Sequence, residues 1–383
     1  MKFIAKTLYG LENILAKELR EIGAQKITVS NRAVIFEGDL RLMYTANYVS
    51  RTSLSILYEL SEFTIRTADD LYRKGRTIEW EKYLDLDDTF SIVPVIKSPV
   101  FNHTGYAALI LKDSIADYFR EKKGRRPSVD NKNPAILINL HISNNKVTVS
   151  LDSSGIPLFK REYRKEAIEA PLNEVLAAGM LLLSGWDGTT CLTDPMCGSG
   201  TIPVEAGLIA CNIPSGRLRK FFGFQHWSNY DLKLYDSVRK DYDSRIRKPE
   251  HPIYGFDVSG QAVKAARANV RRAGLAEYIN IEECDFKNLK PLSDNGFIFI
   301  NPPYGERLSQ GETNMLYSMI GSTLKHHFHD HTAWIISSNK QSLKNIGLKP
   351  TEKHILFNGA LECLYVRYDL YEGSRKSRGI TNH

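Results

Sequence analysis

The chain has 383 residues, of which 42% are hydrophobic and 25% are charged, and its formal net charge is +7. This length predicts two or three domains, each large enough to bury its own core. Since no apolar run approaches ~18 residues, a membrane-spanning helix is excluded. The five cysteines form no Cys-x-x-Cys pair, which favours a reduced, cytoplasmic protein without a structural metal.

The first expected domain covers residues 1–60, where patterns typical of strands alternate with patterns typical of helices. In chain order, a strand is expected at residues 3–8, a helix at 11–22, strands at 27–29 and 33–36, and a helix at 40–57.

The second expected domain covers residues 61–165. A helix is expected at 104–121. Strands are expected at 136–142 and 146–151, because the residues between them, Ser143-Asn144-Asn145, are a turn signal. The serine, glycine and proline residues that follow the second strand indicate a linker.

From about residue 166 onward, strands and helices alternate, which predicts a doubly wound α/β domain. A short strand at 189–193 runs into Asp194-Pro195-Met196-Cys197-Gly198-Ser199-Gly200-Thr201, and a helix follows at 202–210. Strand, glycine turn and helix form a nucleotide-binding geometry, because small residues let a ligand approach backbone N–H groups at the helix start.

The residues around this turn favour a cationic ligand. The dinucleotide fingerprint requires a third glycine where this chain has Pro203, and no lysine follows the glycines as it does in a phosphate-binding loop. A carboxylate at Asp194 is unfavourable for a pyrophosphate but suits a cation. S-adenosylmethionine carries an ammonium and a sulfonium group, so it fits this turn better than NAD or ATP.

Further strands of this domain also end in polar residues. They are expected at residues 253–257, 279–286 and 296–300, with a helix at 259–273. Asp257 ends one strand and suits the ribose hydroxyls of such a cofactor. Asp285 is placed to accept from an adenine amine beside the ring of Phe286. Together with Asp194 and Asn301, these residues are expected along one carboxyl edge of a parallel sheet, where ligands bind.

The apolar run 296–300 is followed by Asn301-Pro302-Pro303-Tyr304. Both prolines lack an N–H group and hold φ near about −65°, so the backbone here offers acceptors only. The Asn301 side-chain oxygen and the Pro302 carbonyl can accept the two N–H groups of an exocyclic amine, with Tyr304 stacked on the base. A plain stop at the strand end is the alternative, but the glycine turn upstream favours methyl transfer to an amino nitrogen of a nucleobase.

Three later segments carry weaker signals. Residues 211–250 form an insertion rich in basic and aromatic residues. Two interpretations remain open: the insertion contacts RNA, or it forms a helical cap that covers the sheet edge. His326, His327, His329 and His331 favour a surface helix end over a metal site. The segments around Asn358-Gly359 predict a terminal β-hairpin.

Two segments resemble the paired signatures of the bacterial THUMP-domain RNA guanine-N2 methyltransferases. They are DPMCGSGTIPVE at 194–205 and NPPYGER at 301–307. The resemblance extends upstream to residues 126–130, 138–142, 151–164 and 170–174, and so covers nearly the whole chain. It is strongest for the N-terminal methyltransferase half of the large-subunit rRNA enzymes of this family.

The resemblance implies the fold and its domains. A Rossmann-like class I methyltransferase domain is expected at 166–383, with a mostly parallel seven-stranded sheet and a terminal antiparallel hairpin. A ferredoxin-like domain at 1–60 and a THUMP RNA-binding domain with its linker at 61–165, both α+β, are expected to precede it.

The resemblance also implies formation of N2-methylguanosine from S-adenosylmethionine, with 23S rRNA as the expected substrate. A tRNA guanine-N2 methyltransferase and, more remotely, a DNA adenine-N6 methyltransferase remain alternatives. The expected catalytic residues are Asn301, Pro302, Pro303 and Tyr304. The expected cofactor-binding residues are Asp194, Cys197, Gly198, Ser199, Gly200, Thr201, Asp257, Asp285, Phe286 and Asn301.

The positive charge is concentrated in one region. Residues 120–165 hold 11 basic and four acidic side chains, whereas the segments before and after are nearly balanced. A basic run is more often a solvated surface, but its position beside a base-directed catalytic domain favours phosphate contacts. The expected RNA-binding residues are Arg125, Arg126, Lys160, Arg161, Arg164, Lys165 and Arg307.

Overall fold

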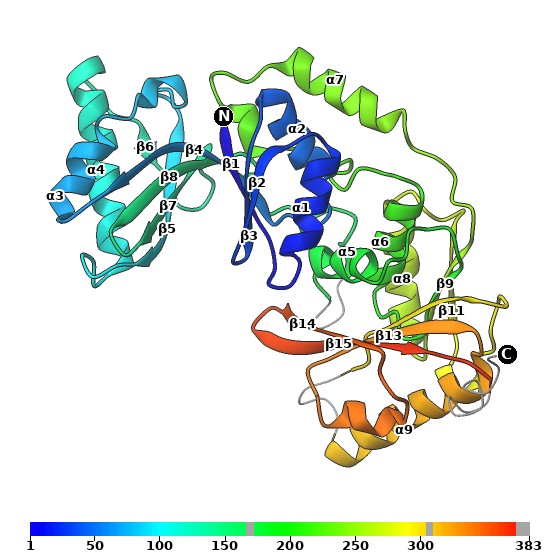
Figure 1. Ribbon diagram of the computed structural model, residues 1–383. Coiled ribbons are helices and arrows are strands. Elements are labelled where there is room, and N and C mark those ends of the chain that lie inside the picture. The colour runs from blue at the N-terminus through cyan, green and yellow to red at the C-terminus, as the bar shows by residue number, and fades with distance from the viewer. Residues whose placement is uncertain (166–171, 304–308, 373–383) are drawn as a thin grey trace, which may run out of the picture. The chain divides into compact units, whose positions relative to one another are not determined.

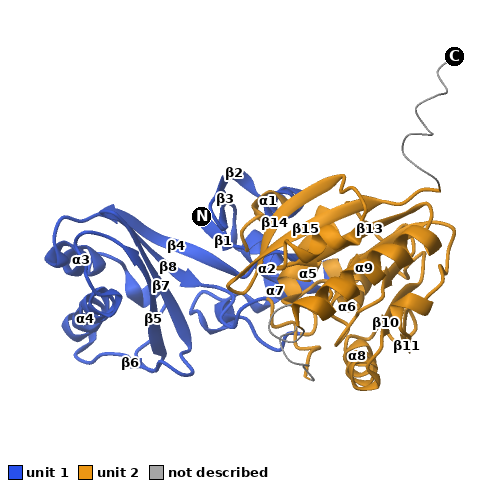
Figure 2. Cartoon of the chain, turned by 90° about the horizontal axis from the view of Figure 1, so that it is seen from below, with its two compact units in different colours: residues 1–7, 15–158, 219–241 blue, residues 8–14, 159–218, 242–383 orange. Residues whose placement is uncertain are grey.

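The computed structural model describes residues 1–165, 172–303 and 309–372 (Figure 1). The expectations for Tyr304 and Arg307 lie outside the described residues. The chain divides into two compact units (Figure 2). Unit 1 comprises residues 1–7, 15–158 and 219–241, and unit 2 comprises residues 8–14, 159–218 and the chain from 242 onward. No helix in the described part of the chain is long and apolar enough to cross a membrane.

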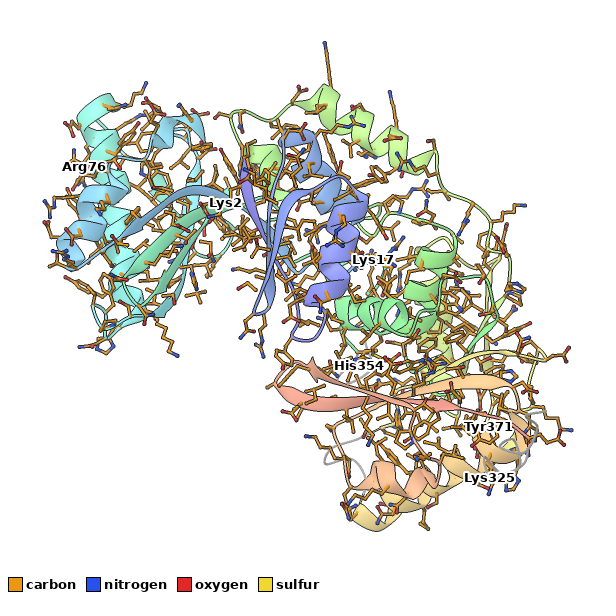
Figure 3. All side chains as sticks on the ribbon, in the orientation of Figure 1. Lys2, Lys17, Arg76, Lys325, His354 and Tyr371 are labelled. Carbon is orange, nitrogen blue, oxygen red and sulfur yellow. The ribbon has the colours of Figure 1, made fainter. Side chains whose placement is uncertain are left out.

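Unit 1 contains one mixed sheet that continues across both expected N-terminal domains. Its order is β2-β3-β1-β4-β8-β7-β5-β6. The strands are β1 (Lys2–Lys6), β2 (Gln25–Ser30), β3 (Ala33–Glu37), β4 (Ser55–Thr64), β5 (Thr89–Lys97), β6 (Ser128–Val129), β7 (Ile136–Ser143) and β8 (Lys146–Asp152). The expected domain boundary after residue 60 falls inside β4, which pairs with β1 through its first half and with β8 through most of its length. Lys2, labelled in Figure 3, reaches from β1 to Glu59 of β4 at 3.0 Å.

Helices α1 (Glu12–Glu21), α2 (Leu40–Val49), α3 (Ala68–Gly75) and α4 (Thr104–Lys123) accompany this sheet. The expected helix 40–57 is too long, since α2 ends at Val49. The turn after α2 is held by Glu18, whose carboxylate accepts from the N–H groups of Arg51 and Thr52 at 2.8 and 3.0 Å. Ile56, which the apolar pattern assigned to the helix, is buried in β4 instead.

Unit 2 contains the expected mostly parallel seven-stranded sheet, in the order β11-β10-β9-β12-β13-β15-β14. The strands are β9 (Leu192–Asp194), β10 (Ile253–Asp257), β11 (Ile279–Glu283), β12 (Gly296–Ile300), β13 (His331–Ser337), β14 (Glu352–Asn358) and β15 (Leu361–Asp369). β15 is antiparallel to both of its neighbours, which confirms the terminal hairpin. Asn358 pairs with Leu361, so the two loop residues are Gly359, at φ 63°, and Ala360. The expected Rossmann-like fold class is confirmed.

Helices cover both faces of this sheet (Figure 1). α6 (Thr201–Ala210), α8 (Gly260–Arg272) and α5 (Glu174–Leu183) lie on one face, and α9 (Gln310–His327) lies on the other. Successive strand residues point to opposite faces. A Cβ at Gly255 would therefore meet Pro203 of α6, whereas Phe256 belongs to the core cluster beneath α9.

The middle of the insertion belongs to the core of unit 1. It contains η2 (Gly223–His226) and most of α7 (Leu232–Asp243). The Phe224 ring is fully buried, 4.5 Å from the ring centroid of Tyr44 on α2 and 5.2 Å from that of Tyr235. Arg219 donates to the carbonyl oxygens of Ile156 and Pro157 at 2.6 and 2.9 Å. The rings of Phe224 and Tyr235 are therefore packed in the core of unit 1 and are not available to stack on RNA bases.

We predict that Phe224→Ala lowers the free energy of unfolding of unit 1 by about 3–5 kcal/mol, because it empties a fully packed aromatic site. Urea denaturation followed by circular dichroism measures this change. The control is His226→Ala, an exposed residue of the same short helix, which should change the stability by less than about 0.5 kcal/mol. Wild-type stability combined with weakened RNA binding in the Phe224 variant would restore the interpretation of the insertion as an RNA clamp.

Candidate active site

A cavity of about 540 Å³ opens at the carboxyl edge of the seven-stranded sheet. Asp194 and Asp257 are the last residues of β9 and β10, and Asn301 directly follows β12. These three strands are adjacent and parallel, so their ends meet at one edge. The lining residues are Leu172, Asp194, Pro195, Met196, Cys197, Gly198, Ser199, Thr201, Ile202, Asp257, Val258, Ser259, Gln261, Ala262, Cys284, Asp285, Phe286, Asn301, Pro302, Pro303, Leu316, Met319, Asn358 and Leu361.

The glycine turn bends sharply between β9 and α6. Gly198 and Gly200 have φ of 54° and 80°, a region that side chains disfavour. The Cys197 N–H donates to the carbonyl of Phe256 at 2.8 Å, which holds the turn against β10. A Cβ at Gly200 would lie 3.1 Å from that of Ala266 on α8. Gly200 supports the turn in this way, although it does not line the cavity.

Two carboxylates face the cavity with different surroundings. Asp194 is 1% exposed and accepts a hydrogen bond from the N–H of Met196 at 3.1 Å. Burial, with the nearby charge of Asp257, raises the pKa of Asp194 well above its usual range. Asp257 accepts from the N–H groups of Gly198 and Ser259, each at 2.9 Å. A cation beside Asp194 would favour its charged form.

Asp285 lies two residues beyond the end of β11 rather than at the strand end. It caps the short helix η3 (Phe286–Asn288) and accepts from the N–H of Lys287 at 3.0 Å. Burial opposes ionisation of this carboxyl, but the N–H and ammonium groups of Lys287 lower its pKa on balance. On this side, the cavity wall therefore presents the ionised carboxylate of Asp285, a hydrogen-bond acceptor, next to the ring of Phe286.

Asn301 carries an unusual polar atom. Its side-chain Oδ1 is buried and has no hydrogen-bond partner among the residues that the structure describes. An unpaired buried acceptor costs free energy, so its retention at a cavity wall fits a ligand that donates an N–H group. Pro302 and Pro303 line the same wall.

The residues expected to bind RNA have different environments. Arg125, Arg126, Lys160 and Lys165 are exposed. Arg161 is 1% exposed and lies 3.6 Å from Glu205 of α6, so its expected role as a phosphate contact is wrong. Arg164 is 13% exposed and pairs with Glu174 at 3.3 Å, which also places it inside the fold rather than on an RNA-facing surface.

The four histidines of 326–331 are not gathered around a metal. His331 begins β13 and is buried, contrary to the expected surface helix end. Its ring Nδ1 lies 2.7 Å from the carbonyl of His329. In the described ranges, no group of three His, Cys, Asp or Glu side chains is arranged to hold a metal ion.

Some cavity residues were not anticipated from the sequence. Val258 is 70% exposed and directly follows Asp257, so its strand-end position was a usable signal. Asn358 ends β14, which runs parallel to β13 because both are antiparallel to β15. It therefore reaches the same carboxyl edge as Asn301. Leu316 and Met319 come from α9 and carried no local signal.

Three family models match consecutive parts of the chain. They are an RlmL ferredoxin-like domain at residues 2–57, a THUMP domain at 66–152 and an RMKL-like methyltransferase domain at 161–367.

Among curated relatives, the chain is 35% identical to "Ribosomal RNA large subunit methyltransferase K/L" of Syntrophotalea carbinolica over 97% of this chain and 54% of that protein. It is 36% identical to "Putative RNA methyltransferase slr0064" of Synechocystis over 96% of this chain and 97% of that protein. The chain thus spans about half the length of the K/L relatives that it matches.

Among solved structures, "SMU.472, a putative methyltransferase complexed with SAH" superposes with a TM-score of 0.88 at 29% identity, covering 97% of this chain and 99% of that one. This chain therefore belongs to the family of proteins with an RMKL-like methyltransferase domain that follows RlmL ferredoxin-like and THUMP domains.

Proposed function

We propose that this chain is an S-adenosylmethionine-dependent RNA methyltransferase that forms N2-methylguanosine in 23S rRNA. The observation that carries the proposal is the buried Oδ1 of Asn301, which has no hydrogen-bond partner in the described ranges and lies in the same cavity as Asp194 and Asp257. The names of the K/L relatives and the SAH complex of SMU.472 support the choice of RNA and of cofactor.

The cofactor assignment follows from the chemistry of the acidic edge. S-adenosylmethionine supplies an electrophilic methyl group when it is bound. Asp194 would hold its ammonium group, because a buried carboxyl regains a favourable charged state only beside a cation. Asp257 would accept from the ribose hydroxyls. Asp285 would accept from the adenine amine, with Phe286 and the exposed Val258 beside the adenine ring.

Asn301 and Pro302 would bind the nucleobase. The lone pair of an exocyclic amine is delocalised into the ring, so the amine is a weak nucleophile. Acceptors at the Asn301 Oδ1 and the Pro302 carbonyl would stabilise the positive charge that develops on this nitrogen. The methylated ammonium loses its proton readily, so the proposal requires no dedicated general base.

The substrate RNA would be recognised outside this cavity. The chain contains a THUMP domain, and Arg125 and Arg126 of unit 1 are exposed. Lys160 and Lys165 of unit 2 are exposed as well. We propose these four side chains as phosphate contacts, which would give the salt dependence typical of such binding.

The direct test is transfer of labelled methyl from S-adenosylmethionine to unmodified 23S rRNA and, separately, to unmodified tRNA, with nucleoside analysis. We expect N2-methylguanosine in 23S rRNA. The same nucleoside in tRNA alone would show that the substrate is tRNA instead of 23S rRNA. N6-methyladenosine would show that the target base was wrongly assigned. Transfer to neither RNA, with demonstrated cofactor binding, would contradict the proposal.

We predict that Asn301→Ala lowers the turnover number by about 10²–10³-fold or more, because it removes an acceptor used in the transition state. Binding of S-adenosylhomocysteine, measured by calorimetry, should stay within about tenfold of wild type. The control is Asn295→Ala, an exposed asparagine at the opposite end of β12, which should leave both quantities unchanged. A loss of cofactor affinity as large as the loss of turnover would refute this division of roles.

We predict opposite effects of Asp194→Asn on stability and on cofactor binding. Burial raises the pKa of Asp194, so the folded chain favours the neutral carboxyl. The stability that this group contributes is present below its unfolded pKa of about 4 and is lost as the pH rises. The variant should therefore unfold at a higher temperature than wild type at pH 7, with little difference near pH 4.

The same Asp194 variant should bind S-adenosylhomocysteine at least about tenfold more weakly, because it cannot form a charge-assisted hydrogen bond with the ammonium group. Differential scanning fluorimetry and calorimetry measure the two effects. Asp294→Asn, at an exposed position, is the matched control and should change neither. Unchanged cofactor affinity in the Asp194 variant would show that Asp194 does not bind the cofactor.

A further inference from the structure

The side chain of Arg164 joins two parts of the cavity wall. Its Nη2 donates to the carbonyl of Leu172 and to the Oγ1 of Thr201, both at 2.8 Å. Leu172 and Thr201 both line the cavity, although they are far apart in the sequence. One guanidinium nitrogen thus uses both of its N–H groups to fix the distance between two segments of the wall.

Arg164 is held in this position by Glu174, whose Oε1 lies 3.3 Å from its Nε. The two side chains are 13% and 7% exposed. Burial raises the pKa of Glu174, and the charge of Arg164 acts in the opposite direction. The rigid, planar guanidinium of an arginine can donate two hydrogen bonds from one nitrogen while its charge faces a carboxylate, which the compact ammonium of a lysine does not reproduce in the same geometry.

The Arg164 bridge, which consists of the hydrogen bonds from Arg164 to Leu172 and Thr201, is not explained by the stability of α6. Thr201 is the first residue of α6, and Gly200 gives this helix no side-chain cap. Because the N-terminus of a helix carries a partial positive charge, a cation beside it is unfavourable. The helix electrostatics of α6 therefore do not favour Arg164 at this place, whereas Glu174 does through its opposite charge.

Arg161 provides an internal comparison. It lies 3.6 Å from Glu205, one turn further along α6 than Thr201, and Tyr163 donates to the same carboxylate at 3.0 Å. Arg161 and Glu205 are almost fully buried, and neither lines the cavity. Two arginines of one short segment thus bind the same helix, and the hydrogen bonds of Arg164 go to residues of the wall.

We propose that Arg164 is a positioning residue for the cofactor: it ties Leu172 to Thr201 and thereby sets the shape of the wall against which the cofactor binds. This inference rests on the proposed function, since it takes the cavity as the S-adenosylmethionine site. Arg164 acts through Thr201 and Leu172 and need not touch the cofactor.

The test measures the dissociation constant of S-adenosylhomocysteine by calorimetry and the unfolding temperature by scanning fluorimetry. The variants are Arg164→Met, Thr201→Val, the double variant, Thr201→Ser and Arg161→Met. We expect Arg164→Met and Thr201→Val each to weaken binding about tenfold, the size of one lost hydrogen bond to a charged group. Because both remove the same bond, the double variant should be no more than about threefold weaker than either single variant.

Two variants act as controls. Thr201→Ser keeps the hydroxyl that Arg164 bonds and should recover most of the affinity that Thr201→Val loses. Arg161→Met leaves the buried Glu205 without its cationic partner, with the Tyr163 hydroxyl still donating to it, and should lower the unfolding temperature. The folded protein should nevertheless bind the cofactor within about twofold of wild type. In methyl transfer, Arg164→Met should raise the KM for S-adenosylmethionine about tenfold and change kcat by less than about threefold.

The possible failures are distinguishable. If the wild-type chain does not bind S-adenosylhomocysteine, the proposed function fails and this inference fails with it. If the wild-type chain binds and Arg164→Met changes only the unfolding temperature, Arg164 is merely structural and the inference alone is overturned. If Arg164→Met does not fold, Thr201→Val still tests the inference. Unchanged affinity for S-adenosylhomocysteine in that variant would contradict a role of the Arg164–Thr201 bond in cofactor binding.

Discussion

β9 has only three residues, Leu192–Asp194, yet it is the strand on which the site depends. It pairs in parallel with β10 on one side and with β12 on the other. Since parallel strands end at the same edge, these two pairings bring Asp194, Asp257 and Asn301 together from positions far apart in the chain. The glycine turn begins directly after β9, and its contact with Phe256 of β10 gives the turn a fixed place against the sheet.

The same edge concentrates groups that are unfavourable to bury. Asp194 is almost fully enclosed next to a second carboxylate, and the Asn301 Oδ1 has no partner among the described residues. Such groups lower stability unless something compensates for them. We infer that the ligands compensate for them, a cationic cofactor at Asp194 and an amine donor at Asn301. Buried groups with a shifted pKa, such as Asp194, are common where proteins bind and react.

Local patterns in the sequence were informative where a short signal determines the structure. β10 has the expected bounds because an apolar run ends in Asp257, and the hairpin turn is displaced by one residue only. The helix expected at 40–57 was wrong because Ile56 pairs within a sheet, and an apolar residue fits either element. The continuity of the unit 1 sheet through β4 likewise depends on pairing with the distant strand β8, which no local pattern reports.

The charged and aromatic residues were harder to interpret for the same reason. Arg161 and Arg164 are basic residues in a basic stretch, and nothing nearby in the sequence reveals that Glu205 and Glu174 are their partners. Phe224 lies in an insertion of the methyltransferase half, but its ring packs against Tyr44. Strand ends, by contrast, follow a simple topological rule, which anticipated Asp194, Asp257 and Asn301 and would also have found Asn358.

The central claim is that the acidic edge binds a cationic cofactor. The most direct measurement is calorimetry of S-adenosylhomocysteine binding between pH 5 and 7, in buffers of different ionisation enthalpy. Because burial raises the pKa of Asp194 in the free protein and an ammonium group favours its charged form, binding should release protons, and the affinity should fall as the pH is lowered. Binding without proton release and with a constant affinity over this range would contradict the claim, as would the absence of binding.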